Sequence, residues 1–268
     1  RKAEFDELKK QVMAYDAVIY AGGITSSQEG EGHERATIEL PAVQQRCLKA
    51  LSETGKPVVY VNFSGSCIAL ADVEPYYAAL VQAWYPGQEG GTAIADVLFG
   101  DFNPSGKLPV TFYKSTSQLP DFLDYSMENR TYRYFQGDPL YAFGYGLSYT
   151  NFQFGKAELS KKAIKAGEGV EVTMPVTNAG QKDGAEVVQV YVKSLTNPDA
   201  PIKSLKAYKR VEVGAGKTAT VTLSLAPDAF AYYKSTEDDL AVFPGKYEIL
   251  YGNSSRTADL QSLSFEVK

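Results

Sequence analysis

Ala17-Val18-Ile19-Tyr20-Ala21, at residues 17–21, is the stretch that decides the first half of the fold. Its apolar side chains follow one another without alternation, as they do in strands of parallel sheets that are covered on both faces. Residues 58–63 repeat this pattern, and residues 41–51 between them show helical spacing with a proline in the first turn. Residues 1–114 are therefore predicted to form an α/β sandwich domain with a mostly parallel sheet, whose ligand loops follow the carboxyl ends of the strands.

The sequence before this first strand also has helical character. Phe5, Leu8, Val12 and Met13 recur at helical spacing and lead directly into residues 17–21. This arrangement indicates that the chain opens inside an α/β unit and that the earlier part of the unit is absent.

The second half of the chain has a different period. Around residues 170–176 and 188–192, valines and a methionine alternate with polar partners, which is the pattern of half-buried strands. Turns rich in glycine, asparagine and proline separate these strands, so residues 151–268 are predicted to form an immunoglobulin-like β-sandwich of the fibronectin III-like type. Residues 115–150 are too aromatic for a solvated linker and are predicted to be a packed inter-domain connection.

Composition excludes several classes of function. The 268 residues carry a net charge of −5 and no basic stripe of the kind that binds phosphates, so no nucleic acid partner is expected. His33 is the single histidine and cannot form a histidine cluster around a metal, and Cys47 and Cys67 fit free thiols better than a disulfide. No apolar run is long enough to cross a bilayer, so no membrane partner is expected either.

Three blocks of sequence resemble family 3 glycoside hydrolases, which include β-glucosidases and β-xylosidases. The first and longest runs from Trp84 to Pro109 and contains Trp84-Tyr85-Pro86-Gly87-Gln88-Glu89-Gly90-Gly91 and Asn103-Pro104-Ser105-Gly106-Lys107-Leu108-Pro109. The other two blocks occur in the same order and spacing as in the family, at residues 130–149 and 244–255. The resemblance covers the whole chain.

This resemblance implies an enzyme with three parts: an N-terminal barrel, an α/β sandwich domain and a fibronectin III-like domain. The barrel carries the nucleophilic aspartate, whereas a loop of the α/β domain supplies the general acid/base glutamate. The expected activity is retaining, exo-acting hydrolysis of terminal β-linked sugars, with no cofactor. Because this chain matches the second and third parts, it is expected to need the N-terminal barrel domain as its partner and to be inactive without it.

The loop that follows the first strand, at residues 22–35, is rich in glycine and acidic residues. On residue pattern alone, Glu29, Glu31 and Glu34 form a solvated acidic cluster between a strand and a helix. A catalytic loop is the other interpretation, because it follows the strand end where a parallel sheet presents side chains to a ligand.

The family resemblance favours the catalytic interpretation and assigns the residues. Glu31 matches the general acid/base in the Gly-Glu-Gly pattern, and Glu29 is the alternative. Glu34 and Arg35 match the acid-Arg pair that follows, and Arg35 and His33 are the candidate substrate-binding residues. No residue is expected to bind a metal.

The sequence leaves the substrate and the competing function open. A β-linked oligosaccharide or an aryl glycoside is the expected substrate, and the short Glu-Gly-Glu form of the loop favours a β-xylosidase over a β-glucosidase. A non-catalytic carbohydrate-binding or structural module is the alternative function. The compartment is open, although a periplasmic or extracellular location is favoured for the full-length enzyme, and the oligomeric state is undetermined.

Overall fold

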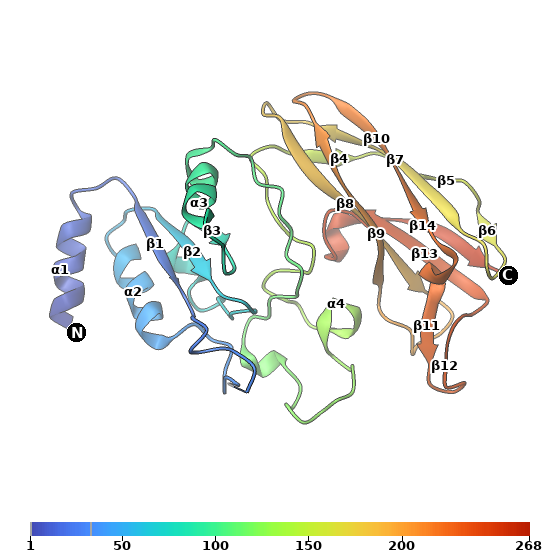
Figure 1. Cartoon of the computed structure of the whole chain (residues 1–268), viewed down its shortest axis with the longest axis horizontal. Coiled ribbons are helices and arrows are strands. Elements are labelled where there is room, and N and C mark those ends of the chain that lie inside the picture. Colours follow the sequence, from blue (N-terminus) through green and yellow to red (C-terminus); the bar gives the residue numbers. More distant parts are fainter. Residues whose placement is uncertain (1, 33) are drawn as a thin grey trace. The chain divides into compact units, whose positions relative to one another are not determined.

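The computed structural model describes residues 2–32 and 34–268, which form two compact units (Figure 1). The first unit consists of the residues up to Leu98 together with Phe112–Asp124 and Gly137–Tyr141. The second consists of Phe99–Thr111, Tyr125–Gln136 and Ala142–Lys268. The segment at 115–150, which the sequence predicts to be a connection, contributes residues to both units.

The first unit is built on a parallel sheet with the strand order β1-β2-β3. Val18 lies opposite Val58, and Val59 lies opposite Ala79, so the carboxyl ends of the three strands meet at one edge. Helix α2 packs against β1 and β2, and α1 packs against α2. The elements are α1 (Lys2–Val12), β1 (Val18–Gly23), α2 (Ala42–Ser52), β2 (Val58–Phe63), η1 (Glu74–Tyr76), β3 (Ala79–Gln82), α3 (Gly90–Phe99) and η2 (Thr116–Gln118). The predicted α/β region with a parallel sheet is confirmed.

Strand β1 differs from its prediction in one respect. Its apolar run predicts cover on both faces, but Ile19 is 54% exposed and the strand alternates between half-buried and exposed residues. The main contacts of β1 are with its neighbour β2 and with α2, so α2 covers one face of the strand and the face that carries Ile19 is open. Strand β2, in the middle of the sheet, has the burial that its sequence predicts, with Tyr60 fully buried in the core of the unit.

The second unit is all-β apart from short helical turns. Strand β7 pairs with β10, β4 and β5, and a second sheet has the order β6-β14-β13-β8-β9. Every second residue of β7 is buried, as the period of 2 predicts. Its elements are α4 (Thr131–Tyr134), β4 (Phe152–Phe154), β5 (Glu158–Leu159), β6 (Ala163–Ile164), β7 (Val170–Asn178), β8 (Gly184–Ser194), β9 (Ser204–Val213), β10 (Thr218–Leu225), η3 (Pro227–Phe230), β11 (Ala231–Lys234), β12 (Asp239–Val242), β13 (Gly245–Gly252), η4 (Thr257–Asp259) and β14 (Leu260–Val267). The predicted β-sandwich is confirmed.

Aromatic and charged residues from outside the sandwich strands complete this unit. Tyr132 stacks on Phe143 with ring centroids 4.2 Å apart and accepts a hydrogen bond from the Leu205 amide. Lys107 donates to Glu186 of β8 at 2.8 Å. The lysine of the Asn103–Pro109 block therefore has a structural partner within its own unit.

Candidate active site

The candidate site lies at the carboxyl edge of the three-stranded sheet. Three segments converge there: residues 24–35 after β1, residues 64–67 after β2 and residues 83–87 after β3. Open α/β sheets bind their ligands at this edge, because the loops after adjacent strands lie side by side there. All three segments belong to the first unit.

The start of the loop after β1 is fixed at Gly23. The side-chain amide of Gln44, on α2, accepts a hydrogen bond from the Gly23 amide at 2.8 Å and donates one to its carbonyl at 2.6 Å. Gly23 has φ +129°, and a Cβ at this position would lie 2.0 Å from the Phe63 carbonyl oxygen. Only glycine fits this close approach of β1 and β2, so the loop leaves the sheet at a defined point.

Glu29 is held by donors from the other two segments. Its Oε1 accepts hydrogen bonds from the Tyr85 hydroxyl and from the Gly65 amide, each at 2.5 Å. Its Oε2 accepts a further hydrogen bond from the Ser66 hydroxyl. The side chain is only 15% exposed. The Glu29 carboxylate therefore joins the loops that follow all three strands.

Arg35 is fixed to the same place from the other end of the loop. Its Nη2 donates to Ser66 Oγ at 2.8 Å and to the Cys67 carbonyl at 3.2 Å, and it lies 3.9 Å from Glu29 Oε2. Its Nη1 is buried and has no hydrogen-bond partner among the described residues. The Arg35 guanidinium therefore lies beside Glu29, the residue that fastens the loop to the other two segments.

These contacts set the ionisation of Glu29. Burial raises the pKa of this carboxyl, but the hydrogen bonds from Ser66, Tyr85 and Gly65 and the charge of Arg35 outweigh that effect, so the pKa is lowered below its usual 4.5. Burial and the neighbouring Glu29 carboxylate raise the pKa of the Tyr85 hydroxyl, which stays protonated as the donor. A carboxylate stabilised in this way is a poor proton donor.

Glu31 has the opposite surroundings. It lies in an exposed turn with Gly32, whose φ of +75° is in the left-handed region, and no described residue bonds to its side chain. Glu34 is exposed as well. His33, the other candidate in this turn, lies outside the described residues. The structure brings Glu29 and Arg35 together and leaves Glu31 exposed on the turn between them.

An open hollow adjoins this loop. Its lining residues are Ile24, Thr25, Ser26, Phe63 and Tyr85. Among the described residues, no group of three His, Cys, Asp or Glu side chains could hold a metal ion.

Sequence reasoning missed Gln44, Ser66 and Tyr85 as residues that shape the site. Tyr85 stands in the block from Trp84 to Gly91, which is easily taken as a purely structural break before a helix. The sequence gives no signal for Tyr85, but the backbone does: its neighbour Trp84 adopts φ +57°. A positive φ is uncommon for a large side chain, and such strained residues cluster at functional sites. Ser66 carries the weaker signal of following β2 at the same sheet edge.

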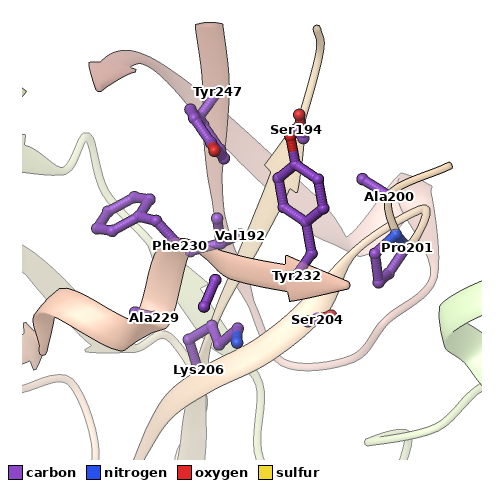
Figure 2. Close-up of a pocket in the computed structure, with 11 residues that line it drawn as sticks. Val192, Ser194, Ala200, Pro201, Ser204, Lys206, Ala229, Phe230, Tyr232 and Tyr247 are labelled. Carbon is purple, nitrogen blue, oxygen red and sulfur yellow. The ribbon is translucent and has the colours of Figure 1, made fainter. Parts of the chain in front are cut away.

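A second cavity lies in the β-sandwich unit (Figure 2). Lys206, Phe230, Tyr232 and Tyr247 are among its lining residues, and its free volume is about 10 Å³. A volume of about 10–15 Å³ holds a single water molecule. A sugar ring does not fit there, so the loop after β1 remains the candidate site.

No helix in the described part of the chain has the length and apolar character needed to span a membrane.

Two family models match the sequence. The glycosyl hydrolase family 3 C-terminal domain matches residues 2–149, and the fibronectin type III-like domain matches residues 186–255.

Individual relatives agree with these models. A xylan 1,4-beta-xylosidase of Xylanibacter ruminicola is 50% identical over 97% of the chain, and a periplasmic beta-glucosidase of Salmonella typhimurium is 34% identical over 99% of it. The crystal structure of a beta-glucosidase from Listeria innocua in complex with isofagomine superimposes with a TM-score of 0.87 at 32% identity, over 100% of the chain. The chain spans 31%, 36% and 39% of these three proteins, respectively, which is about a third of their length.

Proposed function

Because the chain belongs to glycosyl hydrolase family 3, we propose that it supplies the general acid/base of a retaining, exo-acting β-glycosidase. Glu31 is the proposed acid/base, and the nucleophile lies on an N-terminal barrel domain. Since the chain spans about a third of its relatives' length, it is expected to be inactive without that domain.

The observation that carries this proposal is the contrast between Glu29 and Glu31 in one loop. Glu29 is tied down as a carboxylate by three hydrogen bonds, whereas Glu31 is exposed on a turn next to Gly32. A general acid must carry a proton at working pH and must reach the leaving oxygen. Glu29 is held as a carboxylate by its donors and cannot move to a sugar, whereas Glu31 is exposed and has no such ties, and this contrast supports Glu31 over the alternative, Glu29.

The chemistry proceeds in two steps. In the first, the protonated carboxyl of Glu31 gives its proton to the glycosidic oxygen while the nucleophilic carboxylate attacks the anomeric carbon and the carbon–oxygen bond breaks. In the second, the Glu31 carboxylate takes a proton from water, the water oxygen attacks the anomeric carbon, and the sugar leaves the nucleophile. Both steps need the two carboxyl groups about 5 to 5.5 Å apart, so the barrel has to present its nucleophile beside this loop.

The proposed substrates are terminal β-linked sugars of oligosaccharides or aryl glycosides. A β-xyloside is the first choice, because the relative that is 50% identical is named a xylosidase, and a β-glucoside is the second. Arg35 is proposed to act by shaping the loop, since its Nη2 is engaged by Ser66 and Cys67. Contact between His33 and the sugar remains a proposal from the sequence.

The test uses a protein in which this chain replaces the matching region of the Xylanibacter ruminicola xylosidase. Replacing Glu31 by Gln should lower kcat for aryl glycosides of poor leaving groups by roughly 10² to 10⁴-fold, because protonation of the leaving oxygen is lost. Dinitrophenyl glycosides need little protonation, so their first step should be much less affected.

Azide should restore turnover of these dinitrophenyl substrates, since it attacks the glycosyl-enzyme without a general base. If Glu29→Gln shows this pattern and Glu31→Gln does not, the assignment moves to Glu29. Turnover of aryl glycosides by the folded chain alone would contradict the need for a barrel. Saturable binding of oligosaccharide without turnover in the joined protein would favour the non-catalytic module.

A further inference from the structure

Both ends of the turn that carries Glu31 are fastened to one serine. Glu29 precedes Glu31 in the loop and accepts a hydrogen bond from the Ser66 hydroxyl. Arg35 follows Glu31 and donates to the same hydroxyl at 2.8 Å. Between these two anchors lie only residues 30–34, so the position of Ser66 limits where Glu31 can go.

The chemistry of a hydroxyl suits this bridge. Ser66 Oγ has one hydrogen to donate and lone pairs to accept with. Its hydrogen is directed at the Glu29 carboxylate, and an oxygen lone pair receives the Arg35 guanidinium hydrogen. Since Arg35 Nη2 and Glu29 Oε2 are 3.9 Å apart, the hydroxyl completes an ion pair that makes no direct hydrogen bond. Both contacts of Ser66 are thus charge-assisted, and such hydrogen bonds are roughly twice as strong as neutral ones.

Ser66 is itself held from the core of the sheet. Its carbonyl accepts a hydrogen bond from the Ser64 hydroxyl at 2.8 Å. Ser64 Oγ accepts hydrogen bonds from Asn62 and Gln82 at 3.2 and 3.1 Å, and Asn62 Oδ1 accepts one from the Tyr60 hydroxyl at 2.6 Å. Asn62, Ser64 and Tyr60 are fully buried. A continuous polar chain therefore runs from the core to the bridge.

We propose that Ser66 is a positioning residue that holds both ends of the acid/base turn, so that Glu31 meets the leaving oxygen in one defined orientation. This inference rests on the proposed function of Glu31. A displacement of about 1 Å of a reacting group costs up to 10²-fold in rate. The Ser66 bridge is therefore expected to change kcat through the position of Glu31 and to leave substrate affinity unchanged.

The activity test compares Ser66→Ala with Ser27→Ala in the joined protein used for Glu31. Ser27 is in the same loop, and among the described residues its hydroxyl bonds only Thr25, at 2.7 Å on the surface, so it is a matched control outside the bridge. Ser66→Ala should lower kcat roughly 10- to 100-fold with KM within about twofold, and the loss should grow as the leaving group becomes poorer. Ser27→Ala should behave as the unmodified protein does.

A second measurement uses the chain as it stands and needs no activity. Hydrogen exchange of the amides at residues 29–35 should become faster in Ser66→Ala and stay unchanged in Ser27→Ala. If Ser66→Ala does not fold by circular dichroism, Arg35→Gln removes the other half of the bridge and is interpreted in the same way.

The two proposals fail differently. Full activity of Glu31→Gln would refute the catalytic assignment, and the exchange experiment would still test the bridge. Loss of activity in Glu31→Gln, together with normal turnover and normal exchange in Ser66→Ala, would refute the positioning role alone. A loss in Ser66→Ala that is the same for every leaving group would also refute it, because misplacement of a general acid must depend on the leaving group.

Discussion

Replacing Lys107 by Met should destabilise the β-sandwich unit by about 3 kcal/mol. The side chains of Lys107 and Glu186 are only 11% and 5% exposed, and their charged atoms are 2.8 Å apart. Removing one partner of a buried pair costs about 3–5 kcal/mol, because the other charge stays buried. Glu186 would keep its hydrogen bonds from Asn253 and from the Val187 amide, which favours the lower end of this range.

The assay is urea unfolding followed by circular dichroism, which reports the secondary structure of both units. Fluorescence of Trp84, the single tryptophan, reports the first unit and serves as the internal control. The double variant Lys107→Met/Glu186→Leu should recover most of the loss, since a buried ion pair is often replaced by apolar residues without cost. A loss below about 1 kcal/mol in Lys107→Met, or no recovery in the double variant, would refute a buried and mutually dependent pair.

Two further predictions concern the first unit. Gly23→Ala should destabilise it by at least about 2 kcal/mol, because φ is +129° and the new Cβ would meet the Phe63 carbonyl. The measurement is urea titration with tryptophan fluorescence. Gly91→Ala is the control and should cost nothing, because a Cβ there meets nothing within 4 Å. Burial raises the pKa of Glu39, but hydrogen bonds from the Thr116 hydroxyl and amide outweigh it and lower the pKa from 4.5 to about 2. The stability that Glu39 contributes is therefore fully present above pH 4.5 and is lost as pH falls towards 2. Thr116→Val should weaken this pH dependence. An equal loss of unfolding free energy on acidification in both proteins would contradict the prediction.

Much of the fold could be predicted because local pattern and tertiary burial agree. The alternation in β7 survives in the structure residue by residue, since each face of that strand meets one environment. Ile19 in β1 shows where this reasoning ends, because an apolar run reports the tendency to be buried and cannot show which face of a strand is left uncovered.

For the candidate site, the residue pattern alone predicts a loop at the sheet edge but does not separate Glu29 from Glu31. Glu29 and Glu31 are two residues apart in a glycine-rich loop, and their residue types are the same. What separates them is a set of donors 36, 37 and 56 positions away in the chain, at Gly65, Ser66 and Tyr85. Nothing in the local sequence around the loop signals those contacts, since they arise only when the parallel strands bring three loops to one edge.

On the proposed function, this division gives Glu29 and Glu31 separate tasks in a single proton transfer. A flexible glycine-rich loop with one glutamate could reach a sugar but would have no fixed position, and the entropy of ordering it would be added to the barrier of each turnover. Glu29 supplies the anchor, and a carboxylate is well suited to it, because it accepts hydrogen bonds from several donors of separate loops at once. The same bonds keep Glu29 ionised, so the anchor cannot compete with Glu31 for the role of acid. In the proposed function the two like residues take different tasks through their surroundings, so variants of Glu29 are predicted to change the position of the proton donor and not its identity.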